Sequence, residues 1–411
     1  MNYITKQQQL ALLALATSLL ACSTARADAV CDWNIKAGEF VVTGRMGAPP
    51  ANRAMAIAQT AVYEAVNTIT KRYPAGPLKL EAAPGTSVDA AVAAANRTAL
   101  AKLLPSQQAA IDTAYQAALS KIADGEAKTS GIALGEQAAA AILASRADDG
   151  AGAAETYRPQ TAPGVYVPTV IPAVTQWAQR KPWLMTSPAQ FRPGPPPALT
   201  SQLWARDYNE IKALGGKSKS RRTDEQTQIA GFWEATLPAI YHGIVLSVAD
   251  APGREVTQNA RLFAAVAQAT DDALLAVFEA KYHYNFWRPV TAIRNGDLDG
   301  NDATERDASW TPFIETPMHP EYPCAHCIVA AAVGTVLQAE VGTGTMPTLT
   351  TSSYLVKGSA RKWVKVDEFV QEVSDARIYD GVHFRNSTEV GTAMGKQIGA
   401  LAVGKFLARR D

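Results

Sequence analysis

Residues 319–327 read His-Pro-Glu-Tyr-Pro-Cys-Ala-His-Cys and lead directly into an apolar run, Ile328 to Val333. The two prolines fix their own φ angles and bias the residues before them away from the helical region, so this approach is extended. The apolar run, continued through Leu337, has the length and composition of a helix. His326 is therefore predicted to lie in the first turn of a helix, where free N–H groups and the positive end of the dipole suit an anion.

The composition is that of a globular protein with no strong overall charge. The chain has 411 residues, of which 47% are hydrophobic and 19% charged, and its formal net charge is +1. This length suffices for one large core or two domains. A nearly neutral chain has no general attraction to nucleic acid or acidic membranes. We therefore expect a small-molecule partner and no nucleic acid, and any anion site must be built from local charges.

The N-terminus has the pattern of a secretory signal peptide, residues 1–27. Lys6 precedes an apolar run from Leu10 to Leu20, and Ala25-Arg26-Ala27 matches a small-x-small cleavage site. The run is too short to span a bilayer as a helix. Leu19-Leu20-Ala21-Cys22 also resembles a lipoprotein box, with Cys22 as the lipid acceptor. The sequence predicts an exported protein, periplasmic or secreted, and favours soluble export over an outer-membrane lipoprotein.

Cleavage after Ala27 would leave three cysteines, Cys31, Cys324 and Cys327. An odd number in an exported protein leaves at least one thiol free. Cys324 and Cys327 form a Cys-x-x-Cys pair that could close a local disulfide at the predicted helix start; a thiol-redox role for this pair is the least favoured functional interpretation. Three cysteines are too few for a fold held together by disulfides.

Helical periodicity covers most of the mature chain, and strand signals are nearly absent from its N-terminal half. The patterns predict helices over residues 45–70, 90–104, 105–122, 130–145, 226–237, 239–248, 256–286, 364–373 and 388–407. The expected fold is all-α, a large helical bundle in which two four-helix bundles could pack together.

The segment from Arg158 to Thr200 differs, because it contains ten prolines. Its aromatic residues argue against simple disorder, and long irregular segments inside compact proteins are usually functional or linkers. We predict an ordered, Pro-rich crossover loop that shapes the mouth of a pocket. The expected organisation is an N-terminal helical region with the crossover, residues 28–200, and a catalytic helical bundle, residues 201–411, joined in one globular unit.

Three clusters contain the residue types that hold a tetrahedral oxyanion. In the first, Lys281 and Arg288 are seven residues apart, which predicts that both project from one face of a helix. An ammonium and a guanidinium together suit a phosphate-like anion. A solvated basic face is the less favoured alternative, because the aromatic neighbours indicate burial and buried charges need partners. The second cluster contains His326, and in the third Arg377 and His383 lie six apart across a glycine-containing turn.

In this order, the clusters resemble the signature of the phosphatidic acid phosphatase type 2 and vanadium-dependent haloperoxidase superfamily. That signature is a lysine, six residues and Arg-Pro, then Pro-Ser-Gly-His, then Ser-Arg with a histidine shortly after. Here its parts read Lys281…Arg288-Pro289, Pro323-Cys324-Ala325-His326 and Ser374…Arg377…His383. More loosely, the segments from Pro49 to Asn67 and from Tyr282 to Pro289 are similar to the exported bacterial haloperoxidase-like branch.

The resemblance implies a role for each residue. His383 would be the covalent ligand of vanadate in a haloperoxidase, or the nucleophile on phosphorus in a phosphatase, and both uses need a neutral imidazole. His326 would be the general acid and base. The side chains that neutralise the oxygens of the anion would be Lys281, Arg288 and Arg377, with Cys324 and Ala325 standing where the motif has serine and glycine and the Ala325 N–H adding a hydrogen bond.

The implied activity is oxidation of a halide by hydrogen peroxide with vanadate as cofactor, and His319, seven residues before His326, favours bromide. An acid phosphatase acting through a phosphohistidine intermediate is the alternative, and a non-catalytic helical envelope protein is a second one. Ser387 stands where many relatives have an acidic residue four positions after the last histidine. The sequence therefore identifies no carboxylate partner for His383.

Overall fold

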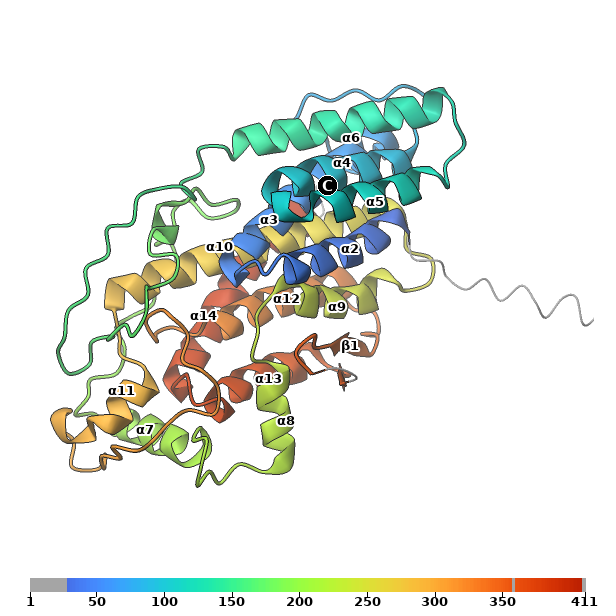
Figure 1. Ribbon diagram of the computed structural model, residues 1–411. Helices are drawn as coiled ribbons and strands as arrows, with labels where there is room; N and C mark the ends of the chain where they lie inside the picture. Colours follow the sequence, from blue (N-terminus) through green and yellow to red (C-terminus); the bar gives the residue numbers. More distant parts are fainter. Residues whose placement is uncertain (1–27, 357–358, 409–411) are drawn as a thin grey trace, which may run out of the picture.

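The computed structural model describes residues 28–356 and 359–408, and this part of the chain is almost entirely helical (Figure 1). It contains thirteen α-helices and one two-stranded antiparallel sheet, so the all-α prediction is confirmed. The predicted signal peptide and Cys22 lie outside the described residues. None of the helices described is long and apolar enough to cross a membrane.

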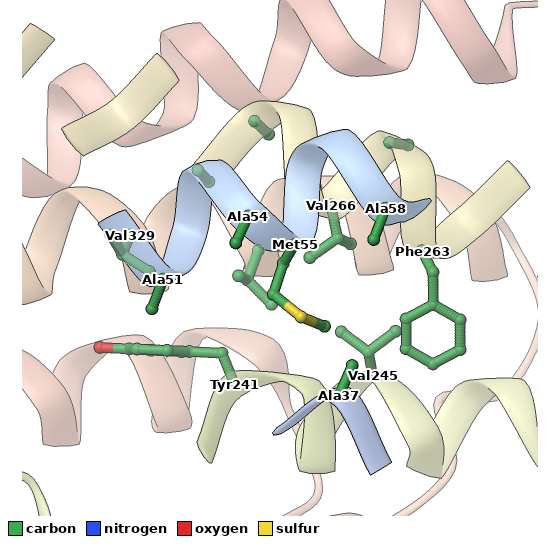
Figure 2. Packing of buried hydrophobic residues seen from close by; sticks show 14 of the residues in the cluster. Ala37, Ala51, Ala54, Met55, Ala58, Tyr241, Val245, Phe263, Val266 and Val329 are labelled. Atoms are coloured by element: carbon green, nitrogen blue, oxygen red, sulfur yellow. The ribbon is translucent and has the colours of Figure 1, made fainter. Parts of the chain in front are cut away.

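Small residues let the N-terminal helices pack closely. A Cβ added at Gly135 of α6 would lie 2.3 Å from the carbonyl oxygen of Ala91 of α4, so a larger residue would force these helices apart. In Figure 2, Met55 of α3 lies among buried side chains of neighbouring helices, Val245 and Phe263 among them. The helices of this part are α2 (Ala29–Thr43), α3 (Ala48–Thr70), α4 (Val88–Leu103), α5 (Gln108–Leu119) and α6 (Glu126–Ser145).

The longest helix, α10, contacts helices of both halves of the chain. The remaining helices are α7 (Gln202–Leu214), α8 (Asp224–Phe232), α9 (Pro238–Ala249), α10 (Val256–Tyr284), α11 (Pro289–Arg294), α12 (Ala325–Val341), α13 (Val366–Tyr379) and α14 (Arg385–Ala402). A π-helical turn, Val403–Leu407, continues α14, and the strands β1 (Leu349–Ser352) and β2 (Ala360–Trp363) form the sheet.

Glycines at every fourth position of α14 fix how it lies against α12. An added Cβ at Gly395 would lie 2.2 Å from the carbonyl oxygen of Ile328, and one at Gly391 would lie 2.6 Å from that of Cys324. Residues four apart share one helical face, so α12 packs directly on this glycine face. This contact places the first turn of α12 beside the second and third turns of α14.

The Pro-rich crossover is ordered and is anchored to α10 by buried carboxylates. Both terminal nitrogens of Arg180 donate to Asp271, at 2.7 and 2.9 Å. Asp272 accepts backbone N–H groups from three consecutive residues beginning at Trp183. In Figure 1 the crossover, drawn in green, runs along the bundle toward the end of α10, where α7 and α11 lie. It carries only a short 3-10 turn, Trp177–Gln179.

Candidate anion-binding site

The first cluster is built differently from the helical face that the spacing predicted. The helix α10 ends at Tyr284, because Asn285 takes the left-handed conformation with φ of 48°. Arg288 therefore does not lie on the same helix as Lys281, but caps the N-terminus of α11 ahead of Pro289. The prediction of one shared helical face is wrong, although both side chains still reach the same buried region.

Lys281 and Arg288 bring the three clusters together through backbone carbonyl groups. The ammonium of Lys281 donates to the carbonyl oxygens of Pro320 and Glu321, at 3.0 and 2.7 Å. The guanidinium of Arg288 donates to the carbonyl oxygen of Val382, at 2.8 Å, one residue before the last histidine of the set. Both cationic side chains are buried, so these contacts replace the water that each charge loses.

The second cluster begins α12 as predicted. Cys324 is the N-cap, and its Sγ accepts the N–H of Cys327 at 3.3 Å. The same two cysteines form the local disulfide that their spacing suggested. Ala325 is the first helical residue, so its N–H is one of the first four that have no acceptor within the helix.

His326 lies in the first turn of α12, buried among cationic groups. Its Nε2 is 3.2 Å from the carbonyl oxygen of Glu234. A carbonyl oxygen only accepts, so Nε2 carries the proton and Nδ1 keeps its lone pair. Burial, followed by the charge of Arg377, holds the pKa of His326 well below its usual range, so the ring is neutral.

The third cluster ends α13, where Gly381 makes the turn with φ of 80°. The guanidinium of Arg377 donates to the carbonyl oxygen of Trp233 at 2.8 Å and pairs with the carboxylate of Asp380. Its Nε and other terminal nitrogen are buried and have no partner within the residues described. Ser374, the serine of the sequence motif, instead bonds to the carbonyl oxygen of Val370.

Glu321 supplies the carboxylate partner of His383 that the sequence did not identify. Its Oε1 lies 2.8 Å from Nδ1 of His383 and accepts the N–H of Phe384 at 3.0 Å. An oxygen that already accepts a backbone N–H is placed to accept from the ring as well, so Nδ1 carries the proton. The Nε2 atom of His383 lies 3.3 Å from a terminal nitrogen of Arg288, and a guanidinium only donates. Both contacts therefore leave the lone pair on Nε2.

One feature of the sequence points to Glu321 as the partner of His383. Glu321 is the one acidic residue between the two prolines of the opening stretch. The position four residues after His383, where a carboxylate was expected, holds Ser387, whose hydroxyl oxygen lies 3.4 Å from Nδ1 of His383. The carboxylate comes from a residue 62 positions away, and only the folded chain brings the two together.

The electrostatics of the site favour an oxyanion. Burial, together with neighbouring arginines, keeps the pKa of His383 and His319 well below the usual range, so these rings are also neutral. Burial raises the pKa of Glu321 to about 7 and that of Asp380 to about 7. The basic groups Lys281, Arg288 and Arg377 thus lie near these two acids and neutral rings, and burial lowers the pKa of Lys281 well below its usual range and that of Arg288 to about 10. An oxyanion fits this site, because it would accept the N–H groups of Arg377 that have no partner and balance the charge.

A cleft of about 830 Å³ reaches Arg288 from the surface. Its walls include Tyr166 and Val170 of the crossover, Val290 of α11 and Met318. The crossover therefore helps to shape a pocket mouth, as predicted. The cleft gives small molecules a route toward the candidate site.

Removing the Glu321 carboxylate is expected to weaken anion binding without unfolding the site. Loss of a carboxylate that orients a ligating histidine costs about 10- to 100-fold in affinity, so Glu321→Ala should lower orthovanadate affinity by this amount. Glu321→Gln should stay within a few-fold of the parent, because its amide oxygen can accept the same two N–H groups. Vanadate titration measures the affinity, and ¹⁵N chemical shifts of His383 report the tautomer. Unchanged affinity and tautomer in Glu321→Ala would contradict this positioning role.

Comparisons with known proteins find a related domain, a related sequence and related folds. The family model described as the VCPO second helical-bundle domain matches residues 261–410. The vanadium chloroperoxidase of Curvularia inaequalis is 27% identical over 179 residues, which are 36% of this chain and 29% of that protein. The matched region therefore spans less than a third of that relative.

Two solved structures share the fold over most of the chain. The first bacterial vanadium-dependent iodoperoxidase superimposes with a TM-score of 0.80 at 23% identity, covering 93% of this chain and 98% of that one. An apo-type bacterial vanadium-dependent chloroperoxidase gives a TM-score of 0.69 at 17% identity, covering 87% and 93%. These likenesses show that the chain has the fold of the bacterial vanadium-dependent haloperoxidases and that its residues 261–410 match the VCPO second helical-bundle domain.

Proposed function

We propose that this protein is a vanadium-dependent haloperoxidase, which binds vanadate and uses hydrogen peroxide to oxidise a halide, with bromide favoured. One observation carries the proposal: Nε2 of the neutral His383 keeps its lone pair within a buried group of three cations. A lone pair is needed to ligate vanadium, and cations are needed to hold the oxygens of vanadate. Relatives of similar fold are named as vanadium peroxidases.

The residues present fit vanadate as an oxyanion. Arg377 offers two buried nitrogens that have no partner among the described residues, and Lys281 and Arg288 would add their positive charges. The Ala325 N–H at the start of α12 would supply a neutral donor. When bound, vanadate would supply a Lewis-acid centre that takes up peroxide and polarises its O–O bond.

His326 would move the proton. Its ring is neutral, and Nε2 is occupied by the Glu234 carbonyl oxygen. Nδ1 therefore keeps a lone pair that can accept a proton from hydrogen peroxide and later return it. Nε2 donates to the carbonyl oxygen of Glu234 whether or not Nδ1 carries a proton. The ring therefore keeps its orientation in both protonation states.

The cysteines suit a protein that releases hypohalous acid. Cys324 and Cys327 are joined in the disulfide next to His326, and Cys31 is a reduced but fully buried cysteine. Oxidation of thiols follows their exposure and thiolate character, and burial raises the pKa of Cys31. The described part of the chain thus exposes no thiol to such an oxidant.

His319 is the residue on which the preference for bromide rests. Its Nδ1 lies 2.9 Å from a terminal nitrogen of Arg288, and its ring packs edge-on against Phe278 with centroids 5.0 Å apart. A neutral imidazole at this position keeps the vicinity of Arg288 polar, whereas a phenyl ring would not. We propose that this polar environment disfavours chloride and so leaves bromide as the preferred halide.

Titration with orthovanadate, followed by two activity assays on the same sample, tests the proposal. The vanadate-loaded protein should brominate monochlorodimedone when hydrogen peroxide and bromide are added, and should lose this activity when a chelator removes vanadate. No bromination between acidic and neutral pH with vanadate bound would refute the haloperoxidase. Hydrolysis of p-nitrophenyl phosphate inhibited by vanadate would then establish the acid phosphatase, and neither activity would point to a non-catalytic protein.

A further inference from the structure

A second cavity, of about 670 Å³, lies among α3, α6, α10 and the turn that continues α14. It shares no lining residue with the candidate anion site. Gln268 on its wall and Lys281 are thirteen residues apart on α10, which separates the two places by about 20 Å along the helix axis. Nothing in the proposed peroxidase chemistry uses this cavity.

Its walls are aromatic rings and guanidinium planes. The guanidinium of Arg146 lies 3.4 Å over the ring of Trp183, and that of Arg261 lies 4.3 Å over Tyr73. Tyr63 of α3 adds a further ring. Aromatic rings and stacked guanidinium groups both hold a flat aromatic ligand, the latter through the cation–π attraction.

Glu64 of α3 is the acidic group of the cavity, and it is 6% exposed. Its carboxylate makes no hydrogen bond or ion pair with any other residue described. Burial raises the pKa of Glu64 to about 6, and the charge of Lys405 opposes this shift. An added Cβ at Gly76 would lie 2.2 Å from both carboxylate oxygens, so the carboxylate packs closely against this glycine and a larger residue would displace it. A buried carboxylate without a partner is costly unless a ligand satisfies it.

Lys405 is the cationic counterpart. Its ammonium donates to Oε1 of Gln268 at 2.8 Å, and Gln268 donates from Nε2 to the hydroxyl of Thr60, also at 2.8 Å. This chain of bonds fixes the ammonium with two N–H groups left over. Of the three arginines that line the cavity, Arg72 pairs with Glu255 and Arg261 with Glu340, while Arg146 donates to the carbonyl oxygens of Lys181 and Pro182. An anionic group of a ligand would therefore bind at Lys405.

We propose that this cavity binds a phenolic carboxylic acid of about the size of 4-hydroxybenzoate. The ring lies between the aromatic and guanidinium walls, the carboxylate pairs with Lys405, and the hydroxyl donates to Glu64. An apolar ligand would leave both charged groups unsatisfied, and a ligand with anions at both ends would be repelled by Glu64. The ligand is thus recognised at three points that differ in chemistry.

Calorimetric titration of the purified full chain with 4-hydroxybenzoate, and with benzoate as a probe lacking the hydroxyl, tests this site. A hydrogen bond to a charged group contributes enough for a tenfold or larger change in affinity. Glu64→Met should therefore weaken 4-hydroxybenzoate at least about tenfold and benzoate much less. Lys405→Met should weaken both ligands by about tenfold or more. Lys36→Met makes the same chemical change at an exposed ion pair on α2 and should alter neither.

The same experiment includes a control for folding and a control for the candidate anion site. Glu64→Met removes an unpaired buried charge, so its melting temperature should equal or exceed that of the parent, and lost binding then reports the ligand contact. His383→Ala should bind 4-hydroxybenzoate as the parent does. The proposal is overturned if 4-hydroxybenzoate does not bind at millimolar concentration, if both cavity variants bind it unchanged, or if His383→Ala abolishes its binding.

Discussion

Replacing His383 by alanine is expected to abolish halide oxidation and to weaken vanadate binding by more than about 100-fold, since losing even a residue that only orients a ligand costs about 10- to 100-fold in affinity. The neutral ring is 1% exposed, and the lone pair on its Nε2 faces the cationic groups. The cationic neighbours cannot replace it, because they only donate. Spectroscopic titration with orthovanadate measures the binding, and bromination of monochlorodimedone measures the activity.

His283→Ala is the matched control, because His283 is an exposed histidine close to Lys281 on α10. It should bind vanadate as the parent does. His326→Ala should separate binding from turnover, keeping vanadate affinity within a few-fold while lowering turnover by about 10²- to 10⁴-fold, the usual contribution of a general acid and base. Vanadate affinity in His383→Ala equal to that of the parent would refute the assignment of Nε2 as the vanadium ligand.

The candidate residues identified in the sequence come together in the fold, but not in the geometry that their spacing predicted. Lys281, Arg288, His326, Arg377 and His383 were identified because chemistry requires those residue types in that order, and the fold does bring them together. The shared helical face of Lys281 and Arg288 was wrong, because one residue, Asn285, leaves the helical region and ends α10 early. Periodicity alone does not report such an end.

Contacts between distant residues were beyond the sequence. The pairing of Glu321 with His383 depends on two loops that meet beside α14, and no local pattern encodes it. The short strands β1 and β2 were also missed, since Leu349-Thr350-Thr351-Ser352 is too short for a clear alternation. In the same way, Asp271 and Asp272 on α10 are fully buried, although adjacent acids in a helix suggest an exposed face. Their burial follows from where the crossover lies.

Replacing Arg180 by methionine is expected to lower the free energy of unfolding by about 3–5 kcal/mol, the usual cost of breaking a buried ion pair. Arg180 is 1% exposed and bonds to Asp271 through two nitrogens, and it also reaches Asp149 at 3.1 Å. The substitution leaves the buried Asp271 carboxylate with the indole N–H of Trp183 as its one remaining side-chain hydrogen-bond donor among the described residues. Urea unfolding measures the loss, and Lys36→Met at its exposed pair should change the value by less than about 1 kcal/mol.

The double variant Arg180→Met/Asp271→Asn decides whether the loss comes from the stranded charge or from packing. Asparagine keeps an acceptor for the Trp183 N–H but removes the charge, and replacing both members of a buried pair is often nearly neutral. Most of the stability lost in Arg180→Met should therefore return. Asp149 keeps a partner in both variants, because Arg53 donates to it at 2.8 Å. A double variant as unstable as Arg180→Met would instead show that the arginine holds the crossover on α10 through its packing, with the charge of Asp271 contributing little.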